Sequence, residues 1–196
     1  MAYAGQTLVN PVSGETLTFI RTAADTAGEA LEVELALTPD GHVPGAHVHP
    51  EQEERFEVLE GRMRFRLGLR RITAETGDVV VVPAGKVHRF ANAGDGVARA
   101  RVTVTPALDM EQLFETTVEL AHEGHVTSKG MPKPLHLALF VQRFRREVRA
   151  PFPPAPVVRA LLAPLAAIAS RRGHGERYGI TATAPVAQPE AATTTA

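Results

Sequence analysis

The sequence of 196 residues contains no cysteine, which excludes disulfide bonds and thiolate chemistry. It also lacks a glycine loop of the Walker or dinucleotide type and a Gly-x-Ser-x-Gly nucleophile motif. Residues 1–14 have neither a basic start nor an apolar run, so we expect a cytoplasmic protein. The apolar stretch 157–172 contains Arg159 and Pro164 and is shorter than the roughly 20 residues that a bilayer crossing needs. We therefore expect no membrane span.

Charge of both signs is present but divided unevenly. The net charge is −1, yet the chain up to Val126 has 11 Lys and Arg against 19 Asp and Glu, and from Thr127 onward it has 10 against 3. The simpler interpretation is that basic helices dock on an acidic barrel or on a partner subunit. The alternative is that the basic part binds an anionic surface.

Histidines and acidic residues are concentrated in the stretch 41–61. His47 and His49 are two residues apart, so in an extended segment both imidazoles leave the same face and can chelate one ion. Glu54 would face the other way on a straight strand. We therefore predict that Pro50 and the polar residues after it bend the chain and return a carboxylate to the imidazoles.

A second stretch, 77–92, supplies a further ligand. It contains a run of valines typical of a buried strand, a Pro/Gly turn and then His88. Three imidazoles and one carboxylate suit a divalent ion of Fe, Mn, Ni, Cu or Zn, so we expect one such ion as the cofactor. The remaining histidines are interpreted as helix-end, solvent-facing or structural residues: His42, His122, His125, His136 and His174.

These two stretches resemble the two signature motifs of the cupin superfamily. The first motif is a glycine, five residues, His-x-His, three or four residues, Glu, six residues and a glycine. The second is a glycine, five residues, Pro-x-Gly, two residues, His, three residues and Asn. The chain matches all the fixed positions without a gap: Gly41, His47, His49, Glu54, Gly61, Gly77, Pro83, Gly85, His88 and Asn92.

The resemblance implies a fold and a metal site. It predicts a mainly β protein, an antiparallel jelly-roll β-barrel followed by about three C-terminal helices. It implies four metal ligands: His47, His49, Glu54 and His88. Glu53 is an alternative to Glu54 because the family spacing allows either, and Glu54 is preferred because it lies six residues before Gly61.

Turn signals and hydrophobic periodicity divide the chain into elements. We expect a cupin barrel over residues 1–106, a helical extension over 107–178 that packs on the barrel or on a dimer partner, and a disordered tail over 179–196. Strands are expected around the turn 11–14, over 30–37, over 55–69 with a turn at Glu60-Gly61, over 78–82 covered on both faces, and as a hairpin of 89–93 and 97–105. Helices are expected over 109–124, 134–148 and 157–172.

Strand parity also predicts the surroundings of the metal. The expected substrate pocket is apolar, and its residues are Phe56, Val58, Met63, Phe65 and Phe90. Such a lining suits a small planar or hydrophobic organic substrate better than a sugar phosphate. An opposite stripe of Arg62, Arg64 and Arg66 is interpreted as a solvated face or as cross-strand pairs with Glu57 and similar residues, with substrate binding as the alternative.

The resemblance implies two classes of reaction. In the first, Fe, Cu, Ni or Mn activates O2 for oxygenative cleavage of an enol or catechol-like substrate, and Glu54 doubles as a proton acceptor. In the second, the metal is a Lewis acid for isomerisation, cyclisation or dehydration, as in cupin cyclases of aromatic polyketides. A third alternative is a non-catalytic module that binds a small molecule.

The chain resembles quercetinase-like, single-domain cupin oxygenases, so the first class is favoured. The expected partners are a small-molecule substrate, O2 and a second copy of the chain, since cupin barrels commonly pair through edge strands. No nucleic acid is expected, because no helix-turn-helix precedes the barrel.

Overall fold

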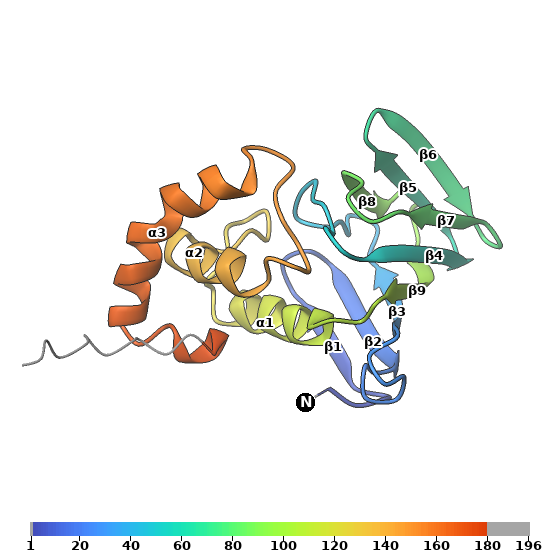
Figure 1. Ribbon diagram of the computed structural model, residues 1–196. Helices are drawn as coiled ribbons and strands as arrows, with labels where there is room; N and C mark the ends of the chain where they lie inside the picture. Colours follow the sequence, from blue (N-terminus) through green and yellow to red (C-terminus); the bar gives the residue numbers. More distant parts are fainter. Residues whose placement is uncertain (1, 180–196) are drawn as a thin grey trace, which may run out of the picture.

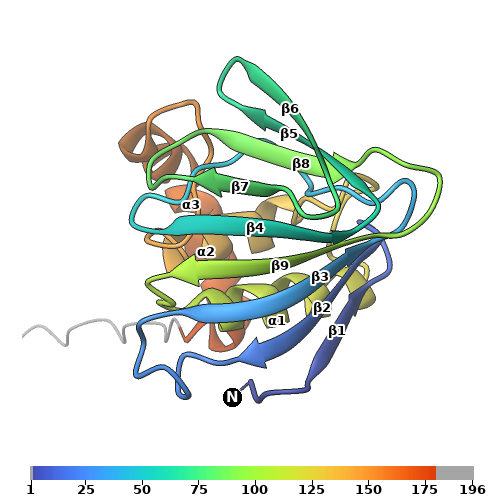
Figure 2. The ribbon, with the colours of Figure 1, turned by 90° about the vertical axis from the view of Figure 1, so that its right-hand side faces the viewer.

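The computed structural model describes residues 2–179 (Figure 1). Within them the chain forms two antiparallel β-sheets and then three α-helices, an arrangement that confirms the predicted jelly-roll with a C-terminal helical extension. Apart from Gly179, the predicted disordered tail lies outside the described residues. The two sheets curve around a common interior, and the helices lie behind the larger sheet in Figure 2.

The larger sheet contains six strands. Their order is β1 (Thr7–Asn10), β2 (Glu15–Arg21), β3 (Leu31–Leu37), β9 (Ala98–Thr105), β4 (Glu53–Glu60) and β7 (Val79–Val82). Apolar and polar residues alternate along β3, and its apolar side chains, Leu31, Val33, Leu35 and Leu37, are all buried. This alternation places one face of the sheet on the core and leaves the other toward solvent, as expected for an antiparallel sheet.

The smaller sheet contains three strands in the order β6 (Arg70–Glu75), β5 (Arg62–Leu67) and β8 (His88–Asn92). The inner face of β5 is buried through Met63, Phe65 and Leu67, and its arginines are exposed. Sequence analysis did not predict β6, because its sequence, Arg-Arg-Ile-Thr-Ala-Glu, contains only two apolar residues and little alternation.

The predicted hairpin between residues 89–93 and 97–105 is wrong. Both strands form, but β8 pairs with β5 in the smaller sheet and β9 pairs with β3 and β4 in the larger one. The link between them therefore crosses from one sheet to the other. Asn92 holds this crossing, because its side-chain amide donates to three backbone carbonyls, those of Leu37, Thr38 and Gly96, at 2.8 to 3.0 Å.

The prediction that the valine strand is covered on both faces is also wrong. β7 is an edge strand of the larger sheet, and Val79 and Val81 are 46% and 42% exposed, whereas Val80 and Val82 are buried. A continuous apolar run does not by itself distinguish a central strand from an edge strand.

Two glycines of the first signature motif are required by close backbone contacts. Gly61 lies in the turn between β4 and β5 at φ +74°, and a Cβ there would lie 2.8 Å from the Val97 carbonyl oxygen. A Cβ at Gly41 would lie 2.9 Å from the backbone of Thr38. Only glycine fits these positions without a backbone shift.

The helical extension consists of α1 (Met110–His122), α2 (Pro134–Arg143), α3 (Ala155–Arg171) and the short 3-10 helix η1 (Glu176–Tyr178). Asp109 precedes α1 as predicted, but its carboxylate binds Arg143 at 2.8 Å instead of capping the helix. The second helix ends at Arg143, five residues before the predicted end. The chain turns there, which buries Phe144 and brings the segment 147–149 onto the barrel.

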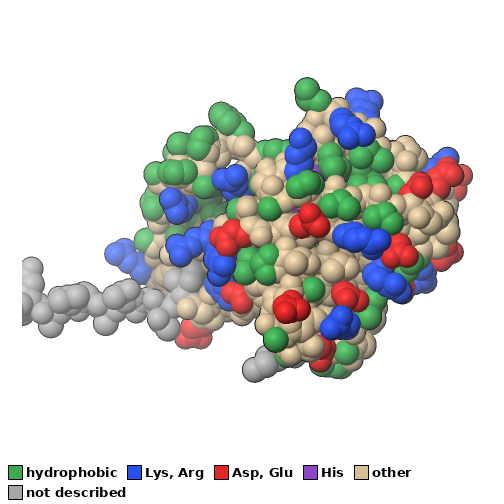
Figure 3. Space-filling view, turned by 45° about the vertical axis from the view of Figure 1, so that its right-hand side comes forward, with side chains coloured by type: hydrophobic (Ala, Val, Ile, Leu, Met, Phe, Trp, Pro, Cys, Tyr) green, Lys and Arg blue, Asp and Glu red, His purple; other side chains and the backbone are tan. Residues whose placement is uncertain are grey.

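Three ion pairs of the described residues join basic residues after Thr127 to acidic residues before it: Arg143 with Asp109, Arg146 with Glu51, and Arg177 with Glu123. Of these, the pair of Arg146 with Glu51 reaches the barrel, whereas Asp109 and Glu123 flank α1, so most of this pairing lies within the helical extension. α3 has an exposed apolar face with Val157, Leu161 and Ile168, where hydrophobic side chains gather in Figure 3. None of the described helices combines the length and apolar character of a membrane crossing.

Candidate metal centre

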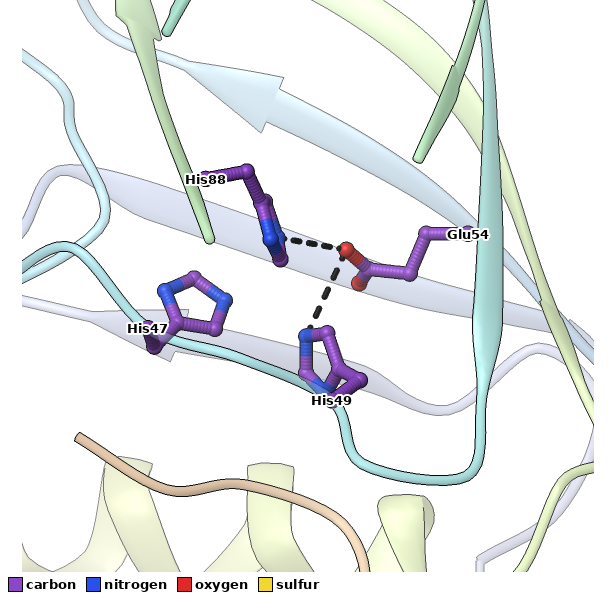
Figure 4. Close-up of side chains that lie close together, drawn as sticks. All are labelled: His47, His49, Glu54 and His88. Atoms are coloured by element: carbon purple, nitrogen blue, oxygen red, sulfur yellow. Dashed lines mark ion pairs between the residues drawn. The ribbon is translucent and has the colours of Figure 1, made fainter. Parts of the chain in front are cut away.

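Four side chains from separate parts of the barrel meet at its mouth (Figure 4). His47 and His49 lie on the extended segment before β4, and Glu54 and His88 lie at the starts of β4 and β8. The segment of His47 does not form a full strand, but His47 and His88 exchange two backbone hydrogen bonds of 2.9 Å. Each residue offers one ligand atom, and these four atoms all lie within 4.8 Å of one another. His49, Glu54 and His88 are buried and His47 is half-buried.

Backbone carbonyls fix the orientation of all three imidazoles. The Nδ1 atoms of His47, His49 and His88 lie 3.0, 2.5 and 3.1 Å from the carbonyl oxygens of Gly45, Glu147 and Lys86. A carbonyl oxygen only accepts, so each Nδ1 is the protonated nitrogen. In the neutral imidazole, Nε2 then has a free lone pair, and this arrangement is the one that metal-ligating histidines adopt.

The inner atoms of the cluster are all acceptors. Oε2 of Glu54 lies 2.8 Å from Nε2 of His88 and 3.4 Å from Nε2 of His49. These three atoms are buried, and no hydrogen-bond donor of the described residues satisfies them while the imidazoles are neutral. Imine nitrogens and a carboxylate oxygen repel each other at such distances unless a proton or a metal cation lies among them. The donor set therefore fits a divalent metal ion.

The electrostatics of the cluster agree with this arrangement. Burial, with the neighbouring His88 and His49, lowers the pKa of His47 to about 3 and keeps it neutral. Burial alone would raise the pKa of Glu54, but its contacts with His49 and His88 hold that pKa well below its usual range. Burial alone would lower the pKa of His49, and the Glu54 carboxylate raises it instead. His49 therefore holds a proton more readily than a free imidazole does, and a metal ion would compete with that proton.

The bend between the two ligand segments has the predicted position. The chain turns at Pro50 and Glu51, and Glu53 and Glu54 open β4 with side chains on opposite faces. Glu53 is exposed, so the structure brings Glu54 and not its alternative into the cluster. Gln52 is fully buried and donates to the carbonyls of Pro106 and Ala107 at 3.0 Å, which ties the bend to the end of β9.

The helical extension contributes to the centre, which sequence analysis missed. The carbonyl that accepts from His49 belongs to Glu147, in the turn after α2, and the backbones of Val48 and Arg149 exchange hydrogen bonds of 3.0 and 2.9 Å. The Glu147 carboxylate is buried and accepts from the backbone N–H of Asp109 at 3.3 Å. The segment 147–149 thus forms a strap from the helices to the ligand segment.

A cavity of about 290 Å³ adjoins the cluster between the larger sheet and the helices. His47, His49 and Glu54 lie in its wall. The rest of the wall is mainly apolar, with Leu17, Val33, Leu35 and Val102 from the sheet and Leu113, Phe140, Val158 and Leu162 from the three helices. Such a cavity suits a small, largely apolar molecule.

The residues predicted to form the substrate pocket divide into two groups. Phe56 and Phe90 line the cavity, and their ring centroids are 5.1 Å apart. Val58, Met63 and Phe65 are buried in the barrel core and do not line it. Phe65 packs behind the other two rings at 5.1 and 6.1 Å. The structure thus places these three residues away from this cavity, because strand parity separates inside from outside but does not locate a cavity within the barrel. Their assignment to the substrate pocket stays a prediction.

Sequence analysis also missed Glu15, a carboxylate in the cavity wall at the start of β2. Burial raises the pKa of Glu15 to about 7, although Ser13 donates a hydrogen bond of 2.6 Å to it. The signal was present in the sequence. Glu15 shares the parity of Leu17 and Phe19, the inward-facing residues of the same strand.

Residues 33–105 match the family described as the cupin domain, which identifies this part of the chain as a cupin domain. The match confirms the resemblance found in the two signature motifs. It covers β3 to β9 and contains all four residues of the cluster.

Individual relatives are more distant. The chain is 33% identical over 95 residues to Oxidoreductase OpS7 of Beauveria bassiana, a match that covers 44% of this chain but only 31% of that protein. A predicted oxalate decarboxylase from Thermotoga maritima has a TM-score of 0.46 and 20% identity, with 52% of this chain and 90% of that chain covered. KdgF from a Halomonas species has a TM-score of 0.48 and 13% identity, and the match covers 54% of this chain and 93% of that chain.

Proposed function

We propose that this protein is a metal-dependent cupin enzyme that oxygenates a small apolar or aromatic substrate, with His47, His49, Glu54 and His88 as the metal ligands. The observation that carries the proposal is the convergence of buried acceptor atoms whose imidazoles are fixed through Nδ1. The apolar cavity beside them and the oxidoreductase name of the curated relative support the reaction class. A redox-active divalent ion would supply the one-electron chemistry that O2 requires.

The side chains of the centre have separate roles in this proposal. The carbonyls of Gly45, Glu147 and Lys86 keep the imidazoles oriented, which reduces the reorganisation that ligand binding requires. Glu54 stays ionised because its pKa is lowered. A carboxylate with a low pKa is a weak base, so we favour the ligand role of Glu54 over the role of proton acceptor.

The cavity suggests the shape of the substrate. Glu15 and the ligand Glu54 lie on strands β2 and β4, which are three strand spacings, or about 14 Å, apart along the sheet. With a pKa of about 7, Glu15 is partly protonated at neutral pH and can donate to a carbonyl or hydroxyl oxygen. We propose a substrate with an apolar body, one oxygen substituent at the metal centre and a second polar group near Glu15.

Oxygen uptake tests the reaction class. The protein should be loaded in turn with Fe, Mn, Ni, Cu and Zn, and assayed with flavonols, catechols and β-diketones. Metal-dependent O2 consumption that matches product formation would support the proposal. Turnover that continues unchanged without O2 would overturn it in favour of an isomerase or cyclase. Tight ligand binding without turnover under any metal would overturn it in favour of a binding module.

Substitution of Glu15 tests the substrate assignment. In the unchanged protein KM should rise about tenfold above pH 7, because ionised Glu15 can no longer donate to the substrate. Glu15→Gln keeps a donor at every pH, so its KM should stay nearly constant across pH 7, with kcat nearly unchanged. Glu53→Gln, at an exposed position of β4, is the matched control and should show the pH dependence of the unchanged protein. The same pH dependence of KM in the two variants would contradict a contact between Glu15 and the substrate.

A further inference from the structure

The outer face of the smaller sheet concentrates arginine side chains. In the strand register, Arg66 on β5 lies directly opposite Arg71 on β6 and Arg89 on β8, and all three are exposed. Directly opposite residues in antiparallel strands point to the same face, with Cβ atoms about 5 Å apart. Arg71, Arg66 and Arg89 therefore form one row across the sheet, the arginine row. Arg64 and Arg62 extend the charge along β5.

The arginine row has no acidic partner among residues 2–179. No carboxylate there lies within ion-pair distance of its guanidinium groups. The expected cross-strand pairing with Glu57 is wrong, because Glu57 pairs with Arg55 on the larger sheet at 3.3 Å. Lys and Arg side chains lie over the top of the molecule in Figure 3, at the level of β5 and β6. Like charges in one row destabilise the sheet, and a bound anion would relieve their repulsion.

A small cavity lies beside the row. It has a volume of about 210 Å³ and is lined by Ala46, Arg66, Gly68, Val87, His88 and Arg89. Lys86 lies at its edge, since its Nζ would be 3.6 Å from a Cβ on Gly68. Arg66 and Arg89 thus line a space that no carboxylate lines, and the ammonium group of Lys86 lies close to it. Guanidinium forks match the oxygens of phosphate and carboxylate groups, and the ammonium adds a point charge.

We propose that Arg66, Arg89 and Lys86 form a binding site for a small di- or polyanion with phosphate or carboxylate groups. The site is separate from the apolar cavity, which is lined by His47, His49 and Glu54. It adjoins the metal centre through His88, which lines the smaller cavity. Arg71 completes the row and binds a second anionic group of the same ligand. The proposal does not depend on the reaction that the metal centre performs.

Calorimetric titration of the full chain tests the proposal, with inorganic pyrophosphate and citrate as probes and NaCl of equal ionic strength as the reference. We expect at least one probe to bind and to raise the melting temperature above that in NaCl. The double variant Arg66→Gln with Arg89→Gln should weaken binding by at least about tenfold, because each lost guanidinium removes charge-assisted hydrogen bonds. The preferred probe distinguishes a phosphate ligand from a carboxylate ligand.

Two further variants separate binding from folding. Arg101→Gln, an exposed strand arginine opposite Glu34 and Glu57, is the matched control and should bind the probes like the unchanged protein. Arg66→Gln alone should melt at the same or a higher temperature without anions, since it removes like-charge repulsion. Equal binding by the double variant, or no effect beyond that of NaCl, would overturn the proposal. Binding of a single-stranded oligonucleotide but of neither probe would also overturn it and assign the face to a polymer.

Discussion

Two clusters in the described part of the chain contain three histidines and one glutamate, and they differ in what surrounds them. At the metal centre, each Nδ1 faces a backbone carbonyl and the Glu54 carboxylate has no arginine partner. In the second cluster, His136 stacks on His125 at 4.3 Å and lies 4.9 Å from His174, and Glu123 is bound by Arg177. No three ligand atoms of the second cluster converge as those of the first do.

The comparison shows that the number of histidines does not define a metal site. In the second cluster, Nδ1 of His136 shares a hydrogen bond of 3.1 Å with the Tyr178 hydroxyl, and the buried Tyr178 docks η1 on α2. The rings therefore pack as a structural contact. What distinguishes the metal centre is a set of carbonyl acceptors behind the rings and a carboxylate that pairs with no Lys or Arg of the described residues.

The largest expected effect is on metal affinity, and it distinguishes the two clusters. His88→Ala removes one ligand and should lower the affinity for a divalent ion by at least about 100-fold, more than the loss of an outer contact would cost. His136→Ala should keep the full metal content. Elemental analysis after dialysis measures both, with the melting temperature as the check on folding. Full metal retention in His88→Ala, or metal loss in His136→Ala, would reverse the comparison.

A smaller effect is expected from the carbonyl acceptors. Arg149→Pro removes the backbone N–H that donates to the Val48 carbonyl at 2.9 Å, so the strap loosens and the Glu147 carbonyl moves from His49. We expect about tenfold weaker metal binding. Arg149→Ala keeps the N–H and should bind metal like the unchanged protein. If the two variants bind equally, the strap does not orient His49.

Lowering the pH should destabilise the second cluster. Burial, with the nearby His125 and His174, lowers the pKa of His136 to about 4, whereas an unfolded histidine titrates near 6.5. Between these two values the unfolded chain binds a proton more readily than the folded chain does. The free energy of unfolding is therefore highest above about pH 6.5, and it falls by about 1 kcal/mol as the pH is lowered toward 4. The surrounding groups are Glu123, His125, His174, Arg177 and Tyr178.

Hydrogen exchange of residues 172–178 measures this loss, since undocking of the segment exposes its amides. His136→Gln should flatten the pH dependence between 6.5 and 4. An unchanged pH dependence in that variant would assign the effect to another group.

The smallest effect concerns the two glutamates. Glu123→Gln breaks an exposed ion pair with Arg177 and should lower the free energy of unfolding by about 0.5 kcal/mol without affecting metal content. Glu54→Gln is the matched variant at the metal centre and should lower metal affinity. Urea denaturation and metal titration of both variants complete the comparison. A metal defect in Glu123→Gln would contradict the structural role of the second cluster.

Most of the fold and the four residues of the cluster could be predicted from the sequence, because local rules determine them. Apolar alternation defined β3 and β5, and the signature spacing identified the four side chains that the structure brings together. The pairing of β8 and β9 could not be predicted, because the short link 93–97 has the composition of a hairpin turn. Nonlocal contacts, among them the hydrogen bonds of Asn92, decide that it crosses between sheets.

The missed parts of the site have a different physical cause. The group that holds His49 is the main-chain carbonyl of Glu147, and every residue has such a carbonyl, so no sequence pattern could identify it. The wall that the helices form also depends on tertiary packing.

The expected homodimer stays a prediction. The exposed apolar face of α3 is a surface through which two copies could pair, and solution scattering would test this.

Anomalous diffraction at the absorption edge of the bound metal would locate the ion itself. We expect one strong peak per chain, within coordination distance of Nε2 of the three histidines and of the Glu54 carboxylate. A peak at the second histidine cluster, or a fully metal-loaded crystal without a peak between His88 and Glu54, would contradict this expectation.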